Sequence, residues 1–314
     1  MLPEPRYRVI LGDCLGSLRA MPDGCVHTCV TSPPYFGLRD YGHEGQIGLE
    51  DTPDAYVARL VEVFREVRRV LRDDGTLWLN LGDSYAQNGG RGEQGATSQR
   101  VGRSNTRAQE RASARRPPLG FKAKDRMMIP ARVAIALQAD GWWLRDEIIW
   151  HKPNPMPASV TDRTTPAHEM IYLLSKGPRY YFDSDAIKEP AASDHPSGNG
   201  FKRAARKTYQ NADGSARESD QQWQDVGGTR NRRSVWTVTT KPYSGAHFAT
   251  FPPDLIEPCI LAGAPEGGTV LDPFGGSGTT AGVALAKGRK AILCEINPDY
   301  IALIADRVRR IAYA

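Results

Sequence analysis

Long hydrophobic runs are missing from this sequence. None of its apolar stretches approaches the roughly 20 residues that a membrane-spanning helix needs. Residues 1–6 read Met-Leu-Pro-Glu-Pro-Arg and lack the basic segment and apolar core of a secretory signal. We therefore expect a cytoplasmic protein with no membrane partner.

Cysteine is also scarce, with five residues in 314. Cys25 and Cys29 have a spacing that occurs in zinc sites, but no second Cys or His pair completes a set of four ligands. An odd number of scattered cysteines in apolar surroundings is typical of reduced thiols. We expect neither disulfides nor a bound metal.

Two phosphate-binding glycine motifs are missing as well. The sequence has no Gly-Lys-Ser/Thr, and Gly276-Ser277-Gly278 is followed by Thr279-Thr280-Ala281, where Gly-x-Gly-x-x-Gly would need a glycine. These absences argue against a nucleoside-triphosphate site and against a dinucleotide site.

What the sequence does contain is an alternation of strand and helix patterns. Strands are predicted at 26–30, 75–81, 142–150, 170–174, 269–271 and 290–294, and helices at 54–71, 130–139, 279–286 and 299–311. Such alternation is typical of an α/β protein whose mostly parallel sheet has helices on both faces.

Two polar segments interrupt this alternation. Residues 86–126 hold ten Lys or Arg and three Asp or Glu, in a chain of net charge +5, and residues 184–235 are rich in Gly, Ser, Asn and Asp. Dispersed basic side chains can neutralise phosphates, so we expect the first segment to hold a nucleic-acid backbone and the second to recognise the target. The expected nucleic-acid contacts are Arg103, Arg107, Arg111, Arg115, Arg116, Lys202 and Arg203.

We accordingly divide the chain into five parts. They are a first half of the core at 1–85, the basic insertion at 86–126, a core continuation at 127–183, the recognition insertion at 184–235 and a last half of the core at 236–314. A motif in each half makes the first the catalytic half and the last the cofactor-binding half.

A glycine turn follows the strand predicted at 269–271. Glycines let the backbone turn tightly and approach a ligand. Glu295 comes at the end of the next strand, where a carboxylate can accept hydrogen bonds from both ribose hydroxyls of an adenosine-containing cofactor. The expected cofactor residues here are Asp272, Pro273, Phe274, Gly275, Gly276, Ser277, Gly278, Thr279 and Glu295.

Ser32-Pro33-Pro34-Tyr35 follows the strand predicted at 26–30. The lone pair of an exocyclic amino nitrogen is delocalised into the base, so the nitrogen attacks a methyl sulfonium poorly until acceptors hold its N–H bonds. The Ser32 hydroxyl and the Pro33 carbonyl can accept, the prolines fix the turn, and Tyr35 offers a flat face to an extruded base. The motif therefore predicts amino-group methylation, with Ser32, Pro33, Pro34 and Tyr35 as catalytic residues.

Together the two motifs resemble the amino-methylating DNA methyltransferases, in the circularly permuted group whose Ser/Asp-Pro-Pro-Tyr motif precedes the glycine motif. The resemblance covers both ends of the chain and the middle strands, and leaves the two polar segments unmatched. It implies S-adenosylmethionine as cofactor, DNA as substrate and a Rossmann-like, seven-stranded sheet. It also implies cofactor contacts at two further segments, at Asp13, Cys14, His247, Phe248 and Phe251.

The first residue of the catalytic motif bears on which base is methylated. Serine resembles the cytosine-N4 members more than the adenine-N6 members, which usually carry Asp there, and a neutral hydroxyl can also donate towards a ring nitrogen. We favour cytosine N4 and keep adenine N6 open. Methylation at cytosine C5 would need a cysteine nucleophile, and Cys259 lies in an apolar, helix-like run where we expect it to be buried.

Two rival functions stay open at this point. They are an inactive DNA-binding protein with a methyltransferase fold, and a methyltransferase acting on RNA or protein. Residues 151–154 and 168–169 could touch DNA, shape the base pocket or serve the fold alone. The recognition sequence, strand preference, a homodimer and a cognate restriction endonuclease are equally open.

Overall fold

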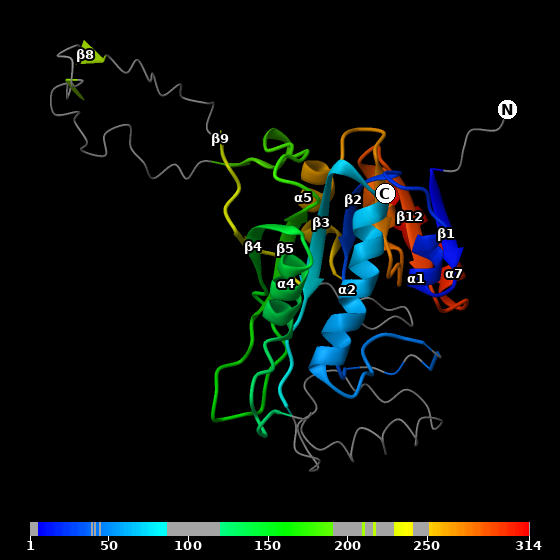
Figure 1. Cartoon of the computed structure of the whole chain (residues 1–314), viewed down its shortest axis with the longest axis vertical. Helices are drawn as coiled ribbons and strands as arrows, with labels where there is room; N and C mark the ends of the chain where they lie inside the picture. The colour runs from blue at the N-terminus through cyan, green and yellow to red at the C-terminus, as the bar shows by residue number, and fades with distance from the viewer. Residues whose placement is uncertain are drawn as a thin grey trace. The chain divides into compact units, whose positions relative to one another are not determined.

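The structure is a computed structural model, shown in Figure 1. It describes residues 6–38, 40, 42–43, 45–86, 120–190, 229–240 and 251–313, and the backbone of short strands at 209–210 and 216–217. Contacts within the chain divide the protein into a larger unit, Met1–Asp183 with Arg233–Ala314, and a smaller unit, Ser184–Arg232.

The smaller unit contains only short elements among its described residues. They are the 3-10 helix η1 (Asp185–Ile187) and the strands β6 (Glu189–Pro190), β7 (Tyr209–Gln210), β8 (Ala216–Arg217) and β9 (Thr229–Arg230). β6 pairs with β9, and Arg230 Nε donates to Glu189 Oε1 at 2.8 Å.

The larger unit is built on an eight-stranded sheet in the order β1-β12-β11-β2-β3-β5-β4-β10. Its strands are β1 (Tyr7–Leu11), β2 (Val26–Thr31), β3 (Leu71–Leu81), β4 (Trp143–His151), β5 (His168–Ser175), β10 (Val235–Thr237), β11 (Thr269–Asp272) and β12 (Lys290–Glu295). Within this sheet β5 alone runs against its neighbours. The predicted mostly parallel sheet is confirmed, but the expected number of seven strands is wrong, because β10 pairs in parallel with β4 and adds an eighth.

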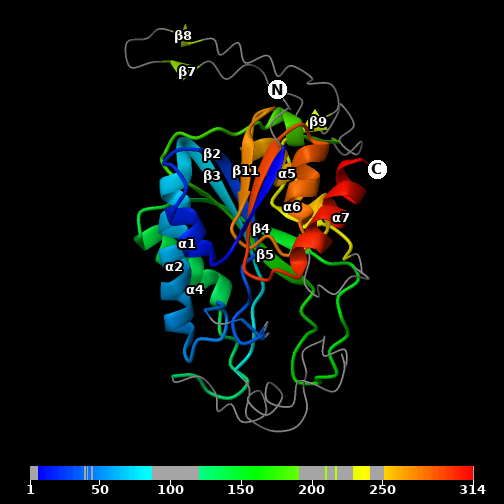
Figure 2. The same cartoon turned by 90° about the vertical axis from the view of Figure 1, so that its right-hand side faces the viewer.

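Helices cover both faces of this sheet, as Figure 2 shows. One face carries α1 (Cys14–Arg19), α2 (Pro53–Val70) and α4 (Ile129–Ala139), and the other carries α5 (Pro253–Gly263), α6 (Thr279–Ala286) and α7 (Tyr300–Ala312). α2 begins after Thr52, whose side chain accepts from the Ala55 N–H at 3.1 Å, with Pro53 in the first turn. Among the described residues, no helix combines the length and apolar character that crossing a bilayer requires.

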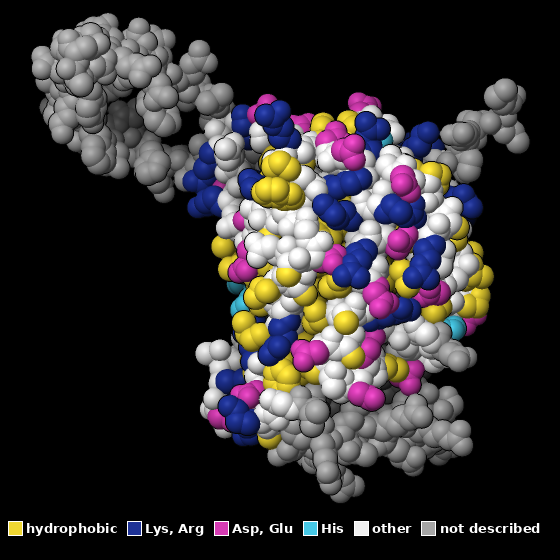
Figure 3. All heavy atoms as spheres, in the orientation of Figure 1, with side chains coloured by type: hydrophobic (Ala, Val, Ile, Leu, Met, Phe, Trp, Pro, Cys, Tyr) yellow, Lys and Arg dark blue, Asp and Glu magenta, His cyan; other side chains and the backbone are white. Residues whose placement is uncertain are grey.

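The outer face of α2 and α4 carries charges of both signs (Figure 3). Arg59 pairs with Glu62 at 2.8 Å within α2, and Arg65 of α2 pairs with Asp140 at the end of α4 at 2.6 Å. Exposed pairs of this kind stabilise a fold only slightly. These pairs balance positive and negative charge on this face. A surface that binds phosphates is instead expected to be mainly positive.

The chain leaves β2 and β11 in opposite directions. β2 continues through α2 to β3 on one side, and β11 continues through α6 to β12 on the other. The two strands are parallel neighbours, with Leu271 beside Cys29. In open α/β sheets ligands bind at the carboxyl ends of strands where the connections diverge in this way. The fold therefore directs attention to the residues that follow β2 and β11.

Candidate active site

Polar residues at or just beyond the carboxyl ends of four adjacent strands lie along one edge of the sheet. β1, β12, β11 and β2 are consecutive parallel neighbours, so their carboxyl ends share that edge. The chain places Asp13 just after β1, Glu295 and Asp272 at the ends of β12 and β11, and Ser32 directly after β2. These three predicted cofactor residues and the predicted catalytic Ser32 therefore share one edge of the sheet.

A hydrogen bond joins the two motifs directly. Thr31, the last residue of β2, donates from Oγ1 to Asp272 Oδ1 at 2.6 Å, across 241 positions of sequence. Thr280 Oγ1 and the Phe274 N–H also donate to this carboxylate, at 2.6 and 3.1 Å. Burial raises the pKa of the Asp272 carboxyl, and these three donors act in the opposite sense. The side chain thus holds the glycine turn against the catalytic turn, and a contact with the cofactor stays a prediction.

The glycine turn requires glycine where it enters α6. Gly278 has a φ of +84°, and a Cβ there would lie 2.9 Å from Cγ2 of Ile304 in α7. Backbone conformation and close packing both disfavour a larger residue. Earlier in the turn, the Gly276 N–H donates to Glu295 Oε2 at 2.7 Å. Glu295 therefore fixes the middle of the turn, as Asp272 fixes its start.

Glu295 combines burial with spare hydrogen-bonding capacity. Its Oε1 accepts from the Asn297 N–H at 2.9 Å, and the residue is only 7% exposed. Burial raises the pKa of this carboxyl, while the backbone N–H groups of Asn297 and Gly276 act to lower it. A carboxylate has about four acceptor sites. Each oxygen can therefore accept a further donor, as a ribose diol would require.

The predicted pair after β1 divides between surface and core. Asp13 caps α1, with Oδ2 accepting from the Gly16 N–H at 2.8 Å, and its side chain is otherwise exposed. The Cys14 thiol is buried among core residues, which raises its pKa to about 12. Asp13 therefore has a side chain accessible to a ligand, whereas the Cys14 side chain is buried, and a cofactor contact of either residue stays a prediction.

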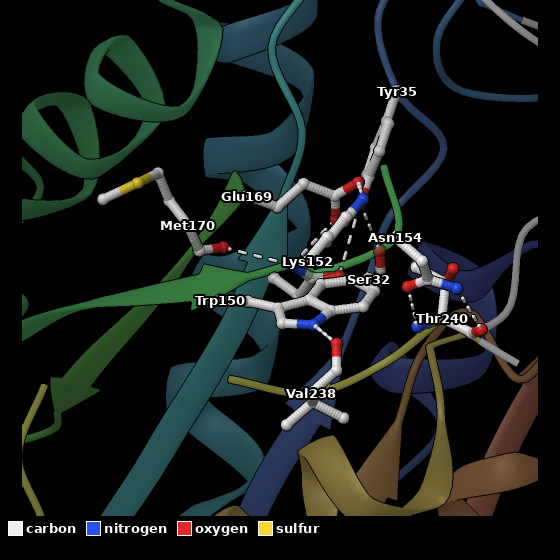
Figure 4. A network of polar contacts seen from close by, with 10 residues as sticks. Ser32, Tyr35, Trp150, Lys152, Asn154, Glu169, Met170, Val238 and Thr240 are labelled. Carbon is white, nitrogen blue, oxygen red and sulfur yellow. Dashed lines mark hydrogen bonds and ion pairs between the residues drawn. The ribbon is translucent and has the colours of Figure 1, made fainter. Parts of the chain in front are cut away.

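The catalytic turn is held by contacts with α2 and β5. Tyr56 Oη in α2 donates to the Pro34 carbonyl at 2.8 Å, which fixes the second proline. The Tyr35 hydroxyl donates to Glu169 Oε2 at 2.8 Å, and Ser32 Oγ lies 3.4 Å from Tyr35 Oη (Figure 4). The Tyr35 ring lies against Gly82, where a Cβ would come within 2.5 Å of Cε2.

The structure also brings to Tyr35 two residues from the segments 151–154 and 168–169, for which the sequence left a DNA contact, the base pocket and a purely structural role open. Lys152, just after β4, forms an ion pair with Glu169 near the start of β5, and each side chain is less than a fifth exposed. His151 pairs with His168 at the ends of these antiparallel strands, so Lys152 and Glu169 are close neighbours there. In the sequence, both residues stand beside predicted strands: Lys152 comes shortly after the strand at 142–150, and Glu169 comes just before the strand at 170–174.

Comparison with known proteins decides the family. The N6/N4 methyltransferase profile, described as DNA methylase, matches residues 26–306. The chain belongs to the DNA methylase family. It is therefore a DNA methyltransferase of the N6/N4 class, as the two motifs together predict.

This DNA methylase has relatives along most of its length. It is 47% identical over 300 residues to the Type II methyltransferase M.XycI of Xanthomonas campestris pv. cyanopsidis, covering 95% of this chain and 86% of that protein. It is 44% identical over 305 residues to the Type II methyltransferase M.SmaI of Serratia marcescens, covering 96% and 91%.

Solved structures share the fold of this DNA methylase. The PvuII DNA methyltransferase (cytosine-N4-specific) matches with a TM-score of 0.61 at 19% identity, over 98% of this chain and 95% of that one. The M1.HpyAVI-SAM complex matches with a TM-score of 0.53 at 14% identity, over 96% and 99%. The predicted methyltransferase fold is thereby confirmed.

Several predicted site residues of the DNA methylase lie outside the described residues. They are His247, Phe248, Arg103, Arg107, Arg111, Arg115, Arg116, Lys202 and Arg203. Phe251 is described, and lies half-buried just before α5. Cys259 lies within α5 and is 1% exposed, so it is buried as predicted and has no access to a base. Over the described ranges, no group of three or more His, Cys, Asp or Glu side chains could hold a metal ion.

Proposed function

We propose that this DNA methylase transfers a methyl group from S-adenosylmethionine to the N4 amino group of a cytosine flipped out of DNA. The hydrogen bond between Thr31 and Asp272 carries the proposal, because it ties the residue before Ser32 to the first residue of the glycine turn. Catalytic and cofactor-binding groups are therefore parts of one site.

The residues at the strand ends fit this cofactor. Glu295 offers the spare acceptor sites that two ribose hydroxyls need, and Asp13 offers an exposed carboxylate on the neighbouring strand. Gly276 and Gly278 have φ angles of +50° and +84°, and because they lack side chains a ligand can approach the backbone of this turn closely. When bound, S-adenosylmethionine supplies an electrophilic methyl group on a sulfonium.

The catalytic turn supplies the acceptors for the base. The Ser32 hydroxyl and the Pro33 carbonyl accept the two N–H bonds of the amino group, which localises the nitrogen lone pair for attack. The two prolines hold this geometry before the base arrives, so little ordering is left to the reaction itself. Direct displacement, with S-adenosylhomocysteine as the leaving group and one proton of the amino group lost to solvent, then needs neither a metal nor a covalent intermediate.

Cytosine N4 is the favoured acceptor because the catalytic motif begins with Ser32, as it does in the cytosine-N4 members that the sequence resembles, whereas the adenine-N6 members usually carry Asp there. Adenine N6 is the second candidate, since its amino group presents the same two N–H donors. Ser32 lies in a half-buried position at the site, so its hydroxyl can reach a bound base.

Nucleoside mass spectrometry tests this assignment. Unmethylated duplex DNA is incubated with the protein and labelled cofactor, then digested to nucleosides, with RNA and protein offered as competing acceptors. We expect label in N4-methylcytosine from the DNA. Label in N6-methyladenine would move the proposal to adenine, and 5-methylcytosine, or label confined to RNA or protein, would contradict it.

A further inference from the structure

Ser32 is the first member of a row of hydrogen-bonded groups that ends in an ion pair (Figure 4). Its Oγ lies 3.4 Å from Tyr35 Oη, which lies 2.8 Å from Glu169 Oε2, and Glu169 Oε1 pairs with Lys152 Nζ. The row connects the catalytic turn after β2 with the adjoining ends of β4 and β5. Hydrogen bonds at catalytic groups are commonly long before substrate binds, and shorten in the complex.

The ion pair sets the direction of each hydrogen bond in this row. An ionised carboxylate has no proton to donate, so the Tyr35 hydroxyl donates to Glu169. Asn80 Oδ1 lies farther from that hydroxyl, at 3.3 Å, and is uncharged, so Glu169 is the stronger acceptor. Burial, and then the charge of Glu169, raise the pKa of Tyr35 well above its ordinary value. Tyr35 therefore keeps its proton, and its oxygen accepts from Ser32.

This direction decides what Ser32 offers to a base. A serine hydroxyl can donate or accept, whereas the N–H bonds of an amino group need acceptors. With its own proton directed towards Tyr35, Ser32 presents lone pairs on its remaining sides. We propose that Glu169, held by Lys152, is a positioning residue that acts through the Tyr35 hydroxyl to keep Ser32 an acceptor towards the amino group of the target base.

Contacts around the ion pair hold it in place. Asn80 Nδ2 in β3 donates to Glu169 Oε2 and to the Met170 carbonyl, both at 3.2 Å. Lys152 Nζ lies 4.3 Å from the ring centre of Trp150, and the Trp150 Nε1–H donates to the Val238 carbonyl at 2.8 Å. β3, β4 and the segment after β10 thus all restrain Lys152 and Glu169, which a positioning role requires.

A double-mutant cycle tests this role, which rests on the proposed function. The variants are Tyr35→Phe, which keeps the ring and removes the hydroxyl, Glu169→Gln, which keeps the shape and removes the charge, and the two combined. The single-turnover rate of methyl transfer is measured with DNA and cofactor saturating, and the dissociation constants of both are measured separately. Glu62→Gln removes an exposed, ion-paired carboxylate of α2 and is the control.

We expect each single substitution to lower the rate about 10- to 100-fold, the range for hydrogen bonds to charged groups, with both dissociation constants nearly unchanged. The double variant should be no more than about threefold slower than the slower single variant, because both changes break the same row. If the rate losses of the two single variants multiply in the double variant, the positioning role is overturned. Weaker DNA binding at an unchanged rate would also overturn it. If Glu169→Gln does not fold, Lys152→Gln replaces it in the cycle with the same expectations.

The two possible failures are distinguishable. A wild-type protein that methylates no amino group in DNA contradicts the proposed function. A wild-type protein that does so, with independent effects of Tyr35→Phe and Glu169→Gln, contradicts the positioning role alone.

Discussion

The carboxylate of Glu295 accepts backbone N–H groups from the glycine turn and from the segment after β12, and its remaining acceptor sites are those proposed for the ribose hydroxyls. A glutamine at this position keeps the shape but has one acceptor oxygen and an NH₂ group that would face N–H donors. We expect Glu295→Gln to weaken cofactor binding about 10- to 100-fold, as measured by calorimetry. Glu266→Gln is the matched control, and equal affinities for the two variants would contradict the assignment.

The protonation of Glu295 makes the same role testable by pH. Burial raises the pKa of the Glu295 carboxyl. On acidification Glu295 is therefore protonated, and loses its charge, at a higher pH than an exposed glutamate. A protonated carboxyl has less acceptor capacity, so cofactor affinity should fall as the pH decreases through this raised pKa. The affinity of Glu295→Gln should change little over the same range, and parallel curves for the two proteins would exclude this cause.

At the scale of elements, the start of α6 depends on Gly278. Alanine there must adopt a φ of +84° and bring its Cβ within 2.9 Å of Ile304, whereas Gly267 has a φ of +74° with open space around its Cβ position. The backbone cost alone is about 1–2 kcal/mol. We expect Gly278→Ala to lower the free energy of unfolding more than Gly267→Ala does in urea denaturation without cofactor. Equal losses would show that α7 does not restrict this turn.

The tie between β2 and β11 can be tested with two buried threonines of β2. Thr31 donates to the carboxylate of Asp272 at 2.6 Å, whereas the hydroxyl of Thr28 contacts uncharged groups of Thr76, the carbonyl at 3.1 Å and Oγ1 at 2.9 Å. Because the acceptor of Thr31 is a buried carboxylate, Thr31→Val should lower the free energy of unfolding by about 1–3 kcal/mol, and by more than Thr28→Val. Thermal and urea unfolding measure both. A larger loss for Thr28→Val would contradict this account of the Asp272 network.

Elements with a strong local pattern could be predicted from the sequence, and those formed by tertiary pairing could not. The predicted helix at 279–286 coincides with α6, because its apolar run lies between two glycines. β10 was not predicted, since its three residues become a strand only by pairing with β4. β1 and α1 were missed for a related reason: each is short, and β1 is an edge strand only partly buried.

The same distinction holds for the candidate site. The places of Ser32 just after β2 and of Glu295 at the end of β12 could be predicted because the local sequence shows both strands. The contact between Tyr35 and Glu169 spans 134 positions and depends on β5 running against its neighbours. Alternating strands and helices predict parallel neighbours, so nothing in that pattern indicated that Lys152 and Glu169 would meet beside the catalytic turn.

At the scale of the whole molecule, the basic segment at 86–126 is proposed to bind the DNA backbone. Replacing Arg103, Arg107, Arg111, Arg115 and Arg116 with Gln should flatten the dependence of DNA affinity on salt, by about 0.9 in the log–log slope for each phosphate that is no longer neutralised. Fluorescence anisotropy at several salt concentrations measures the slope. Replacing the exposed Arg19, Arg309 and Arg310 with Gln is the control. Equal slopes for the two variants would remove the segment from the DNA interface.

We propose that the carboxyl ends of β2 and β11 form one site with separable halves, one for the amino group and one for the cofactor. Ser32→Ala tests it most directly, because it removes a proposed acceptor for the amino group and leaves Asp272 and Glu295 in place. The measurement is the single-turnover rate of methyl transfer to DNA beside the dissociation constant of S-adenosylmethionine. We expect the rate to fall at least about 100-fold while cofactor affinity changes less than about twofold. An unchanged rate, or equal losses in rate and cofactor affinity, would contradict the account.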